Sequence, residues 1–307
     1  MTASERACVI WRFVDGRPGH ENQTLGLVRA LERRLAVDCL EINAKQSWQT
    51  IRSLIAGSKQ WRAQPRPDLL IGCGHRTHLP LLAARNRFGG RAIVCMKPSI
   101  PVKWFDLCLV PEHDGIPECT SVLLTRGALN TVRPAEHLNP RSGLILIGGP
   151  SKSHGWDEGW LQRQITELLA ANPEVKWTLT TSPRTPPATV ELLASLAGKT
   201  ICIIPFKETT KDWVAAQLSQ CGQVRVTEDS VSMIYESLTS GAQVGLLEVP
   251  RLKSGRVTRG IDGLVQKGQV FRGARSPDGN VTRPVFCEAD RCAAVVHQRF
   301  LMARAIK

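Results

Sequence analysis

Short apolar runs and longer segments with apolar residues at helical spacing alternate along the 307-residue chain. Short apolar runs favour strands, and a 3.6-residue period favours helices. In the first half the predicted strands span 7–14, 37–42, 69–72, 92–96, 107–110 and 122–124. The segments 21–35, 47–56 and 80–87 between them predict helices. Such alternation is typical of a parallel sheet covered by helices on both faces.

The same alternation starts again after residues 135–142, a stretch that includes Pro140 and breaks the periodicity. The predicted strands of the second half span 143–147, 177–181, 201–205, 224–226, 244–249 and 270–271. Helices are predicted over 157–171, 230–239 and 290–306. In the first of these helices, the spacing points four side chains inward, namely Trp160, Leu161, Ile165 and Leu168. The glycine-rich, basic stretch 251–273 predicts a mobile loop.

These elements predict an α/β fold with two Rossmann-like domains facing across a cleft. The expected domains are residues 1–138 and 139–288, and a C-terminal helix over 289–307 is expected to pack back toward the first domain. Ligands of open α/β sheets bind at the carboxyl ends of strands and the amino ends of helices. Polar residues at strand ends are therefore the candidates for a site.

The stretch 224–250 predicts a strand, a polar turn, a helix and a second strand. Asp229, Ser230 and Ser232 lie at the turn, and Glu236 follows one helical turn later. This placement makes the four side chains candidates for ligand binding. The alternative is that the serines only cap the helix and the glutamate is only solvated, as in any α/β protein.

Two polar loops follow strands of the first half. Residues 15–20 read D-G-R-P-G-H and follow the carboxyl end of the first strand. Gly16 and Gly19 permit a close backbone approach, and Asp15, Arg17 and His20 are expected at the strand end. A tight turn with surface charges explains this loop equally well. After the third strand, His75 and Arg76 follow a glycine and predict an anion pocket. After the fifth strand come Glu112 and His113.

The second half carries a glycine-rich loop at 148–153, G-G-P-S-K-S, between a strand and a helix. Backbone N–H groups, hydroxyls and one ammonium group suit phosphate binding. The spacing of a Walker loop and of a G-x-G-x-x-G dinucleotide fingerprint are both absent from this chain. Ser182 and Arg184 follow the next strand, and Lys207 follows the one after it.

The net charge indicates which class of partner the protein binds. The chain has 40 Lys and Arg against 27 Asp and Glu, a net charge of +13, which favours an anionic partner. One Tyr, seven Phe and the lack of a nucleic-acid-binding motif disfavour nucleic acid. A membrane surface or a phosphate-bearing substrate is the better interpretation.

Location follows from what the sequence lacks. The first residues do not have the pattern of a signal peptide, and we expect no membrane span because no apolar run of about 18 residues occurs. Ten scattered cysteines without a C-x-x-C pair predict buried free thiols and no metal site. We expect a cytoplasmic protein, with a peripheral position on the inner membrane as an option.

Residues 228–241, E-D-S-V-S-M-I-Y-E-S-L-T-S-G, resemble the donor motif of the peptidoglycan lipid-intermediate N-acetylglucosaminyltransferases, which have the GT-B fold. The resemblance implies that Ser230 and Ser232 approach the donor phosphates and that Glu236 binds the ribose hydroxyls. The loop at 148–153 resembles the glycine-rich donor loop of the same enzymes. Their acceptor loop, G-G-T-G-G-H, is replaced by D-G-R-P-G-H, so their lipid-linked acceptor is not carried over.

Over its full length the chain is similar to the mitochondrial-fission Elm-like family. The shared motifs are D-G-R-x-G-H-x-N-Q-x-x-G-L at 15–27 and T-x-D-S-x-S-M-x-x-E at 227–236. Together the resemblances imply a metal-independent, inverting GT-B glycosyltransferase without a cofactor. Residues 1–138 would present the acceptor, and residues 139–288 would bind a nucleotide sugar.

The expected acceptor is a lipopolysaccharide-type glycolipid or another anionic, phosphorylated molecule at the cytoplasmic membrane face. The expected partners are the nucleotide sugar, this acceptor and an anionic membrane surface, without nucleic acid. The alternative is a GT-B-shaped adaptor that binds membranes or a partner without turnover. A third interpretation, a nucleotide-sugar epimerase or other NAD enzyme, needs a dinucleotide fingerprint that the sequence lacks.

The site residues expected on this basis fall into three groups. Asp15 and His20 are the candidate catalytic bases, with Asp15 ranked first because it directly ends the first strand. The acceptor-side residues are Gly16, Arg17, Gly19, His75, Arg76, Glu112 and His113. The nucleotide-sugar-binding residues are Gly148, Gly149, Ser151, Lys152, Ser182, Arg184, Lys207, Asp229, Ser230, Ser232, Met233 and Glu236.

Overall fold

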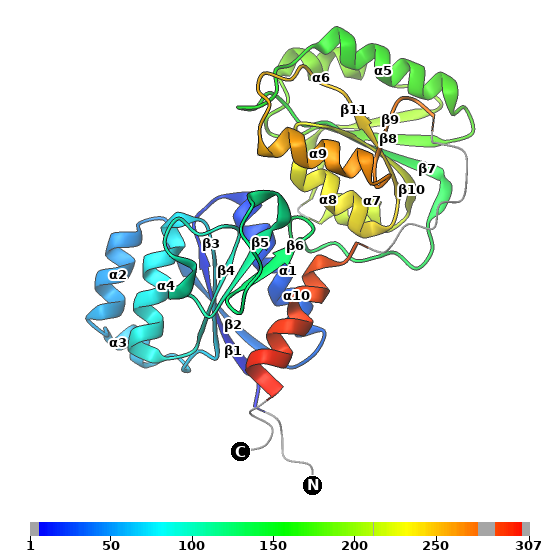
Figure 1. Cartoon of the computed structure of the whole chain (residues 1–307). Coiled ribbons are helices and arrows are strands. Elements are labelled where there is room, and N and C mark those ends of the chain that lie inside the picture. The colour runs from blue at the N-terminus through cyan, green and yellow to red at the C-terminus, as the bar shows by residue number, and fades with distance from the viewer. Residues whose placement is uncertain (1–5, 211, 276–285, 303–307) are drawn as a thin grey trace. The chain divides into compact units, whose positions relative to one another are not determined.

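The computed structural model describes residues 6–210, 212–275 and 286–302. It divides the chain into two compact units, which are Met1–Thr131 with Glu288–Lys307, and Val132–Cys287. Each unit is built on its own six-stranded sheet (Figure 1). The chain leaves the first unit after Thr131 and returns to it at Glu288, whereas the predicted limits were 138 and 288. The cleft between the domains stays a prediction.

The sheet of the first unit has the order β2-β1-β3-β4-β5-β6, and all its strands are parallel. The strands are β1 (Cys8–Val14), β2 (Val37–Asn43), β3 (Leu69–Cys73), β4 (Arg91–Cys95), β5 (Leu107–Pro111) and β6 (Val122–Thr125). Strands β3 and β5 are buried at every residue, as expected of parallel strands covered on both faces. Because the strands are parallel, the loops that follow them meet at one edge.

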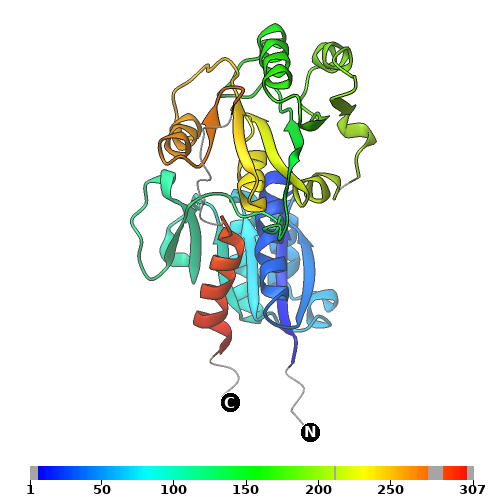
Figure 2. The ribbon, with the colours of Figure 1, turned by 90° about the vertical axis from the view of Figure 1, so that its right-hand side faces the viewer.

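Helices cover both faces of this sheet. On one face α1 (Pro18–Glu32) and α10 (Glu288–Val296) pack side by side, with Leu27, Leu31 and Cys292 in the core (Figure 2). The other face carries α2 (Ser47–Ile55), the short α3 (Lys59–Arg62) and α4 (His75–Phe88). Two 3-10 turns, η1 (Val102–Trp104) and η2 (Glu112–Asp114), flank β5. A π-helical turn, η4 (His297–Leu301), ends α10, and the predicted continuation to 306 lies partly outside the described residues.

Two helices begin earlier than predicted. Helix α1 starts at Pro18 instead of 21, because proline fits the first helical position, where its missing N–H is not needed. Helix α4 starts at His75 instead of 80, directly after Gly74, and Pro80 lies inside it. His20 and His75 therefore stand in the first turns of helices and not in loops.

The sheet of the second unit has the order β12-β11-β10-β7-β8-β9 and is also parallel. Its strands are β7 (Asn139–Leu146), β8 (Lys176–Thr180), β9 (Ile201–Ile204), β10 (Cys221–Thr227), β11 (Gln243–Leu247) and β12 (Phe271–Arg272). Helices α5 (Glu158–Ala171) and α6 (Pro187–Ala194) pack on one face, over Trp177. The other face carries α7 (Trp213–Leu218), α8 (Val231–Ser240) and α9 (Arg256–Gln266), as right-handed crossovers require (Figure 1). The 3-10 turn η3 (Phe206–Glu208) follows β9.

Three expectations for this unit are wrong. The stretch 251–273 is not a loop throughout, because α9 buries Thr258, Ile261 and Leu264 at helical spacing. Trp160 does not point inward: it is 37% exposed, while Leu161, Ile165 and Leu168 are buried. Strand β7 starts at Asn139, so Pro140 lies inside a strand and not in a break.

All ten cysteines are free thiols, and six of them are buried. Among the described residues, no helix is long and apolar enough to cross a bilayer. The same part of the chain shows no group of three or more His, Cys, Asp or Glu side chains arranged to hold a metal ion.

Candidate functional site

Asp15 and His20 form a hydrogen-bonded pair in the first unit. Asp15 ends β1 with its side chain fully buried, and its Oδ2 lies 2.8 Å from His20 Nδ1 in the first turn of α1. Asp15 Oδ1 accepts a hydrogen bond from the Arg17 backbone N–H at 3.1 Å. Because an ionised carboxylate only accepts, His20 Nδ1 must carry the proton, which leaves the lone pair on Nε2.

Gly74, at the end of β3, makes room for this pair. A Cβ at Gly74 would lie 2.5 Å from His20 Cε1 and 2.9 Å from Asp15 Oδ2. Gly74 also has φ 85 and ψ 153, a combination that other residues rarely adopt. The close approach and the backbone conformation both require glycine here, and the sequence predicted only that this loop contains one.

The structure places the acceptor-side residues in two separate places. Gly16, Arg17 and Gly19 are exposed beside the Asp15–His20 pair, and His75 and Arg76 are exposed in the first turn of α4. Glu112 and His113 are exposed in η2, after β5. Strand β5 is three strand spacings from β1, roughly 14 Å along the edge. These last two residues are therefore not brought to His20.

Three residues near this edge were missed. His78 is buried, its Nδ1 lies 3.3 Å from Ser99 Oγ, and burial together with His75 and His20 lowers its pKa to about 4. Met96 follows β4 with φ 71, a strained conformation of the kind that collects at functional sites. Lys45 lays its aliphatic stem against Gly16. Only His78 had a sequence signal, since it ends the polar run after β3.

In the second unit, Asp229 joins the ends of three strands. Its carboxylate is fully buried, accepts from the Gly149 N–H at 3.1 Å and pairs with Arg184 at 2.8 Å. Arg184 also donates to the carbonyls of Gly149 and Pro150. Asp229 Oδ1 has no hydrogen-bond partner among the described residues. The predicted residues Gly149, Arg184 and Asp229 are therefore brought together.

The glycine loop does not present its amides as predicted. The Gly148 N–H donates to Thr227 Oγ1 at 2.8 Å, and the Gly149 N–H donates to Asp229, so neither points to a phosphate. A Cβ on Gly148 would lie 2.5 Å from Asp229 Oδ1, and one on Gly149 would collide with the Arg184 backbone. These glycines shape the loop. Thr227 is a missed residue of this site.

Two hydroxyls fasten the loop after β8 to the glycine loop. Ser182 Oγ donates to the Gly148 carbonyl at 3.0 Å, and Thr185 Oγ1 donates to the same carbonyl at 2.5 Å. Both side chains are buried. Ser182 is thus placed as a structural partner of the glycine loop, and Thr185 was missed.

Helix α8 begins beside this cluster. Ser230 is its N-cap residue but makes no capping hydrogen bond with its side chain, so the first N–H groups keep their partial positive charge. Ser232 is exposed in the first turn, Met233 and Glu236 are half-buried, and Gly241 ends the helix in the left-handed conformation.

The remaining predicted donor residues lie at the sides. Ser151 Oγ accepts from the backbone N–H groups of Ser153 and His154 and so holds the turn after Gly149. Lys152 is exposed in that turn. Lys207 is exposed after β9, three strand spacings or roughly 14 Å from β10, so it is not brought to Asp229.

A second cluster surrounds Glu228, which the sequence did not single out. Glu228 is 3% exposed and accepts from Arg251 Nη2 at 2.9 Å and from Arg272 Nη2 at 3.3 Å. Both arginines also bind Asp262, whose pKa the hydrogen bond from Arg251 lowers. Arg272 further pairs with Glu248 at 3.2 Å.

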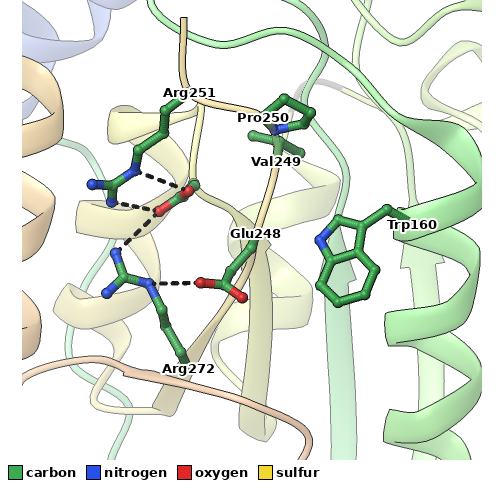
Figure 3. A pocket seen from close by; sticks show the side chains of 7 residues that line it. Trp160, Glu248, Val249, Pro250, Arg251 and Arg272 are labelled. Atoms are coloured by element: carbon green, nitrogen blue, oxygen red, sulfur yellow. Dashed lines mark hydrogen bonds and ion pairs between the residues drawn. The ribbon is translucent and has the colours of Figure 1, made fainter. Parts of the chain in front are cut away.

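Four residues of the cluster line a pocket of about 470 Å³ together with Trp160, Val249 and Pro250; they are Glu228, Glu248, Arg251 and Arg272. Figure 3 shows Glu248 between Arg272 and the Trp160 ring. His154 is fully buried, and a backbone bridge joins it to Arg251. Burial lowers the pKa of His154, against the opposing effect of Glu228 and Asp229. His154 is therefore neutral near pH 7, and it too was missed.

The two units present different chemical groups. The first presents an imidazole oriented by a buried carboxylate, which is an arrangement suited to removing a proton. The second presents an uncapped helix N-terminus, a partly exposed arginine and a carboxylate one turn further along α8, which suit a phosphorylated ligand with hydroxyl groups.

Several solved structures are similar to this chain in fold, and two of them carry a UDP-sugar in their names. A putative UDP-N-acetylglucosamine 2-epimerase from Listeria monocytogenes gives a TM-score of 0.56 at 13% identity, over 84% of this chain and 82% of that chain. Phytolacca americana UGT2, solved with UDP-2-fluoro-glucose and pterostilbene, gives 0.52 at 8% identity, over 97% and 91%. Acinetobacter baumannii MurG gives 0.50 at 13% identity, over 98% and 94%. At these identities the similarity shows the fold, and it confirms the predicted GT-B class.

A protein of Rickettsia prowazekii (strain Madrid E), the uncharacterized protein RP120, is 22% identical over 313 residues. The matched region covers 84% of this chain and 88% of the Rickettsia protein. The sequence pattern of the family described as Mitochondrial fission ELM1 matches residues 18–300. This match spans most of the chain and confirms the resemblance carried by the motifs at 15–27 and 227–236. The chain therefore belongs to the Mitochondrial fission ELM1 family.

Proposed function

We propose that the protein is a metal-independent glycosyltransferase. It transfers a sugar from a nucleotide-sugar donor to a lipopolysaccharide-type glycolipid at the cytoplasmic face of a membrane, and it uses no cofactor besides the donor. The observation that carries the proposal is the contact between buried Asp15 and His20 in the first unit.

His20 is the catalytic base in this proposal, and Asp15 is its positioning residue. The Asp15 carboxylate fixes the proton on Nδ1, so Nε2 accepts the proton of the acceptor hydroxyl. The hydroxyl oxygen then forms a bond to the anomeric carbon of the donor, whose bond to the diphosphate breaks. This proposal reverses the ranking expected from the sequence, because Asp15 is buried and already hydrogen-bonded while the His20 side chain is 19% exposed.

The donor is proposed to bind at the amino end of α8. Its diphosphate would accept hydrogen bonds from the first-turn N–H groups and from the exposed Ser232 hydroxyl. Arg184, whose side chain is 43% exposed, would add positive charge as the diphosphate leaves. Glu236, one turn along the helix, would accept hydrogen bonds from the ribose hydroxyls.

The charge of the first unit supports an anionic acceptor. Residues 1–131 and 288–307 contain 22 Lys and Arg against 13 Asp and Glu, a net charge of +9. Arg17, Lys45 and Arg76 are exposed at the edge that carries His20. Such a field attracts a phosphorylated glycolipid.

A two-step experiment tests the proposal. First, thermal stability is measured with a panel of nucleotides and nucleotide sugars, since a ligand at 100 times its Kd stabilises by about 2.7 kcal/mol. Second, the stabilising donor is incubated with lipopolysaccharide-type acceptors, and the glycolipid, free sugar and sugar epimers are quantified by mass spectrometry. A glycolipid gain of one sugar is the expected result. Absence of any stabilising nucleotide would favour the adaptor, and epimerised donor without transfer would favour an epimerase.

A further inference from the structure

The outer face of α2 exposes two large apolar side chains. Trp48 is 68% exposed and Ile55 is 64% exposed, the highest values for large apolar residues among those described. They are seven residues apart with the exposed Arg52 between them, so all three lie on one side of the helix. We call Trp48, Arg52 and Ile55 the α2 face.

Among residues 6–210, 212–275 and 286–302, none covers this face. The opposite side of α2 carries Ile51 and Leu54, which are buried, and the helix packs against α4 (Figure 1). The α2 face thus points away from the core of its unit. Exposed aromatic and aliphatic groups in such a position mark contact sites more often than isolated apolar residues do.

The surroundings of the α2 face are basic. Residues 42–67 contain no Asp or Glu, while Lys45, Arg52, Lys59, Arg62 and Arg66 are all exposed. Over 42–105 there are 11 Lys and Arg against one carboxylate, Asp68. Asp68 is buried and accepts a hydrogen bond from the Val9 N–H, so it is not part of the surface. Within residues 42–105 no exposed carboxylate accompanies these basic side chains.

We infer that the α2 face docks onto an anionic lipid surface. Tryptophan and isoleucine enter the boundary between headgroups and acyl chains, and a rim of lysine and arginine binds anionic headgroups. A second copy of the chain fits less well, because two α2 faces would bring like charges together.

Docking in this way places the candidate base near the lipid. The stem of Lys45 lies against Gly16, so that a Cβ there would be 3.2 Å from Lys45 Cδ. Gly16 follows Asp15, and Trp48 is three residues beyond Lys45. A membrane at α2 therefore lies beside the loop that leads to His20. Only this link to a lipid-borne acceptor rests on the proposed function; the lipid contact does not.

Vesicle sedimentation tests the inference with the full chain. Binding is measured to vesicles of phosphatidylcholine alone and of phosphatidylcholine with phosphatidylglycerol at about three to one. The wild type should bind the anionic vesicles, more weakly at high salt and hardly to the neutral ones. Trp48→Ala should lower the partition coefficient roughly tenfold or more. Arg52→Ala should lower it roughly fivefold.

Trp104→Ala is the matched control. Trp104 is also an exposed tryptophan of the first unit, at 44%, but its carbonyl binds Arg85 beside the carboxylate of Asp106. Its loss should leave binding unchanged. Unfolding curves confirm that all variants fold, and sugar transfer to a detergent-soluble acceptor should be the same in all of them. This readout separates a failure of docking from a failure of the proposed function.

Several results would overturn the inference. One is that the wild type does not bind anionic vesicles. Another is that Trp48→Ala and Trp104→Ala lose vesicle binding equally. Self-association that disappears in Trp48→Ala would assign the face to a second copy instead. Binding to RNA with no binding to vesicles would assign the basic surface to nucleic acid.

Discussion

Replacing Gly74 with alanine should displace the Asp15–His20 pair without touching the donor site. The new Cβ would lie 2.5 Å from His20 Cε1, whereas non-bonded carbons stay about 3.5 Å apart. The imidazole must therefore move by about 1 Å. A displacement of that size at a reacting group costs about 10²-fold in rate.

The substitution also strains the backbone, and this effect needs its own control. Gly74 has φ 85 and ψ 153, a conformation that costs other residues about 1–3 kcal/mol. Gly89, at the other end of α4, has φ 84 and ψ −159, and nothing lies within 4 Å of the position of its Cβ. Gly89→Ala thus carries a similar strain without the collision.

The two variants should behave alike in stability and differently in catalysis. Urea unfolding should show a loss of about 1–3 kcal/mol in both, with a further loss in Gly74→Ala if the ring moves reluctantly. Per folded molecule, kcat should fall about 10²-fold in Gly74→Ala and stay within about twofold of the wild type in Gly89→Ala. Donor affinity, measured by calorimetry, should be unchanged in both. Equal kcat in the two variants would refute the role of the pair.

Three further predictions concern single side chains. His20→Ala should lower the transfer rate about 10²–10⁴-fold without changing donor affinity. Asp15→Asn should lower the rate comparably, because the amide no longer fixes the His20 tautomer. Normal rates in both variants would place the base elsewhere. Glu236→Gln should weaken nucleotide binding by roughly 1.5–3 kcal/mol in calorimetry without shifting the Tm, and unchanged affinity removes Glu236 from the donor site. Because burial and its neighbours lower the pKa of His78 to about 4, against about 6.5 when unfolded, the unfolded chain binds the proton first as pH falls. Stability should therefore fall between pH 6.5 and 4 by up to about 3 kcal/mol; His78→Phe should flatten this slope in urea unfolding at each pH, and the exposed His113→Gln should not.

The fold was predictable because the apolar runs, the helical spacing and the turn residues of the sequence all indicate the same α/β architecture. Every predicted strand exists, since short apolar runs separated by helical segments have few solutions other than buried parallel strands. The misses have local causes. Helix α9 carries glycines among its apolar positions, which hides the stripe of Thr258, Ile261 and Leu264. Trp160 has helical spacing but turns outward, because periodicity does not fix which large side chain the core can hold.

The candidate site was predictable as a set of strand ends and not as a set of contacts. Asp15 and His20 are five residues apart, so their pairing is local. Arg184 and Asp229 are 45 residues apart and meet because β8 and β10 both flank β7. The Gly149 amide donates to Asp229 because the Asp229 side chain points toward it. Residue spacing in the sequence does not give the direction of a single side chain. Thr227 opens the motif at 227–236, but the motif did not show that its hydroxyl binds the Gly148 amide, and Met96 had no sequence signal.

The end of β10 shows how the second unit prepares its site. Glu228 and Asp229 are adjacent, buried and directed to different partners: Asp229 binds Arg184, and Glu228 binds Arg251 and Arg272. The carboxylates are buried while their arginines are partly exposed, and removing an arginine would leave a buried charge with one partner fewer, which is destabilising. Arg184 lies in the connection after β8, Arg251 in the connection after β11, and Arg272 in β12. The two carboxylates therefore link these three segments to the start of α8. On the proposed function, a diphosphate at α8 would meet loops that are already ordered. Its binding would then need little further loss of conformational entropy, which is how preorganised sites gain affinity.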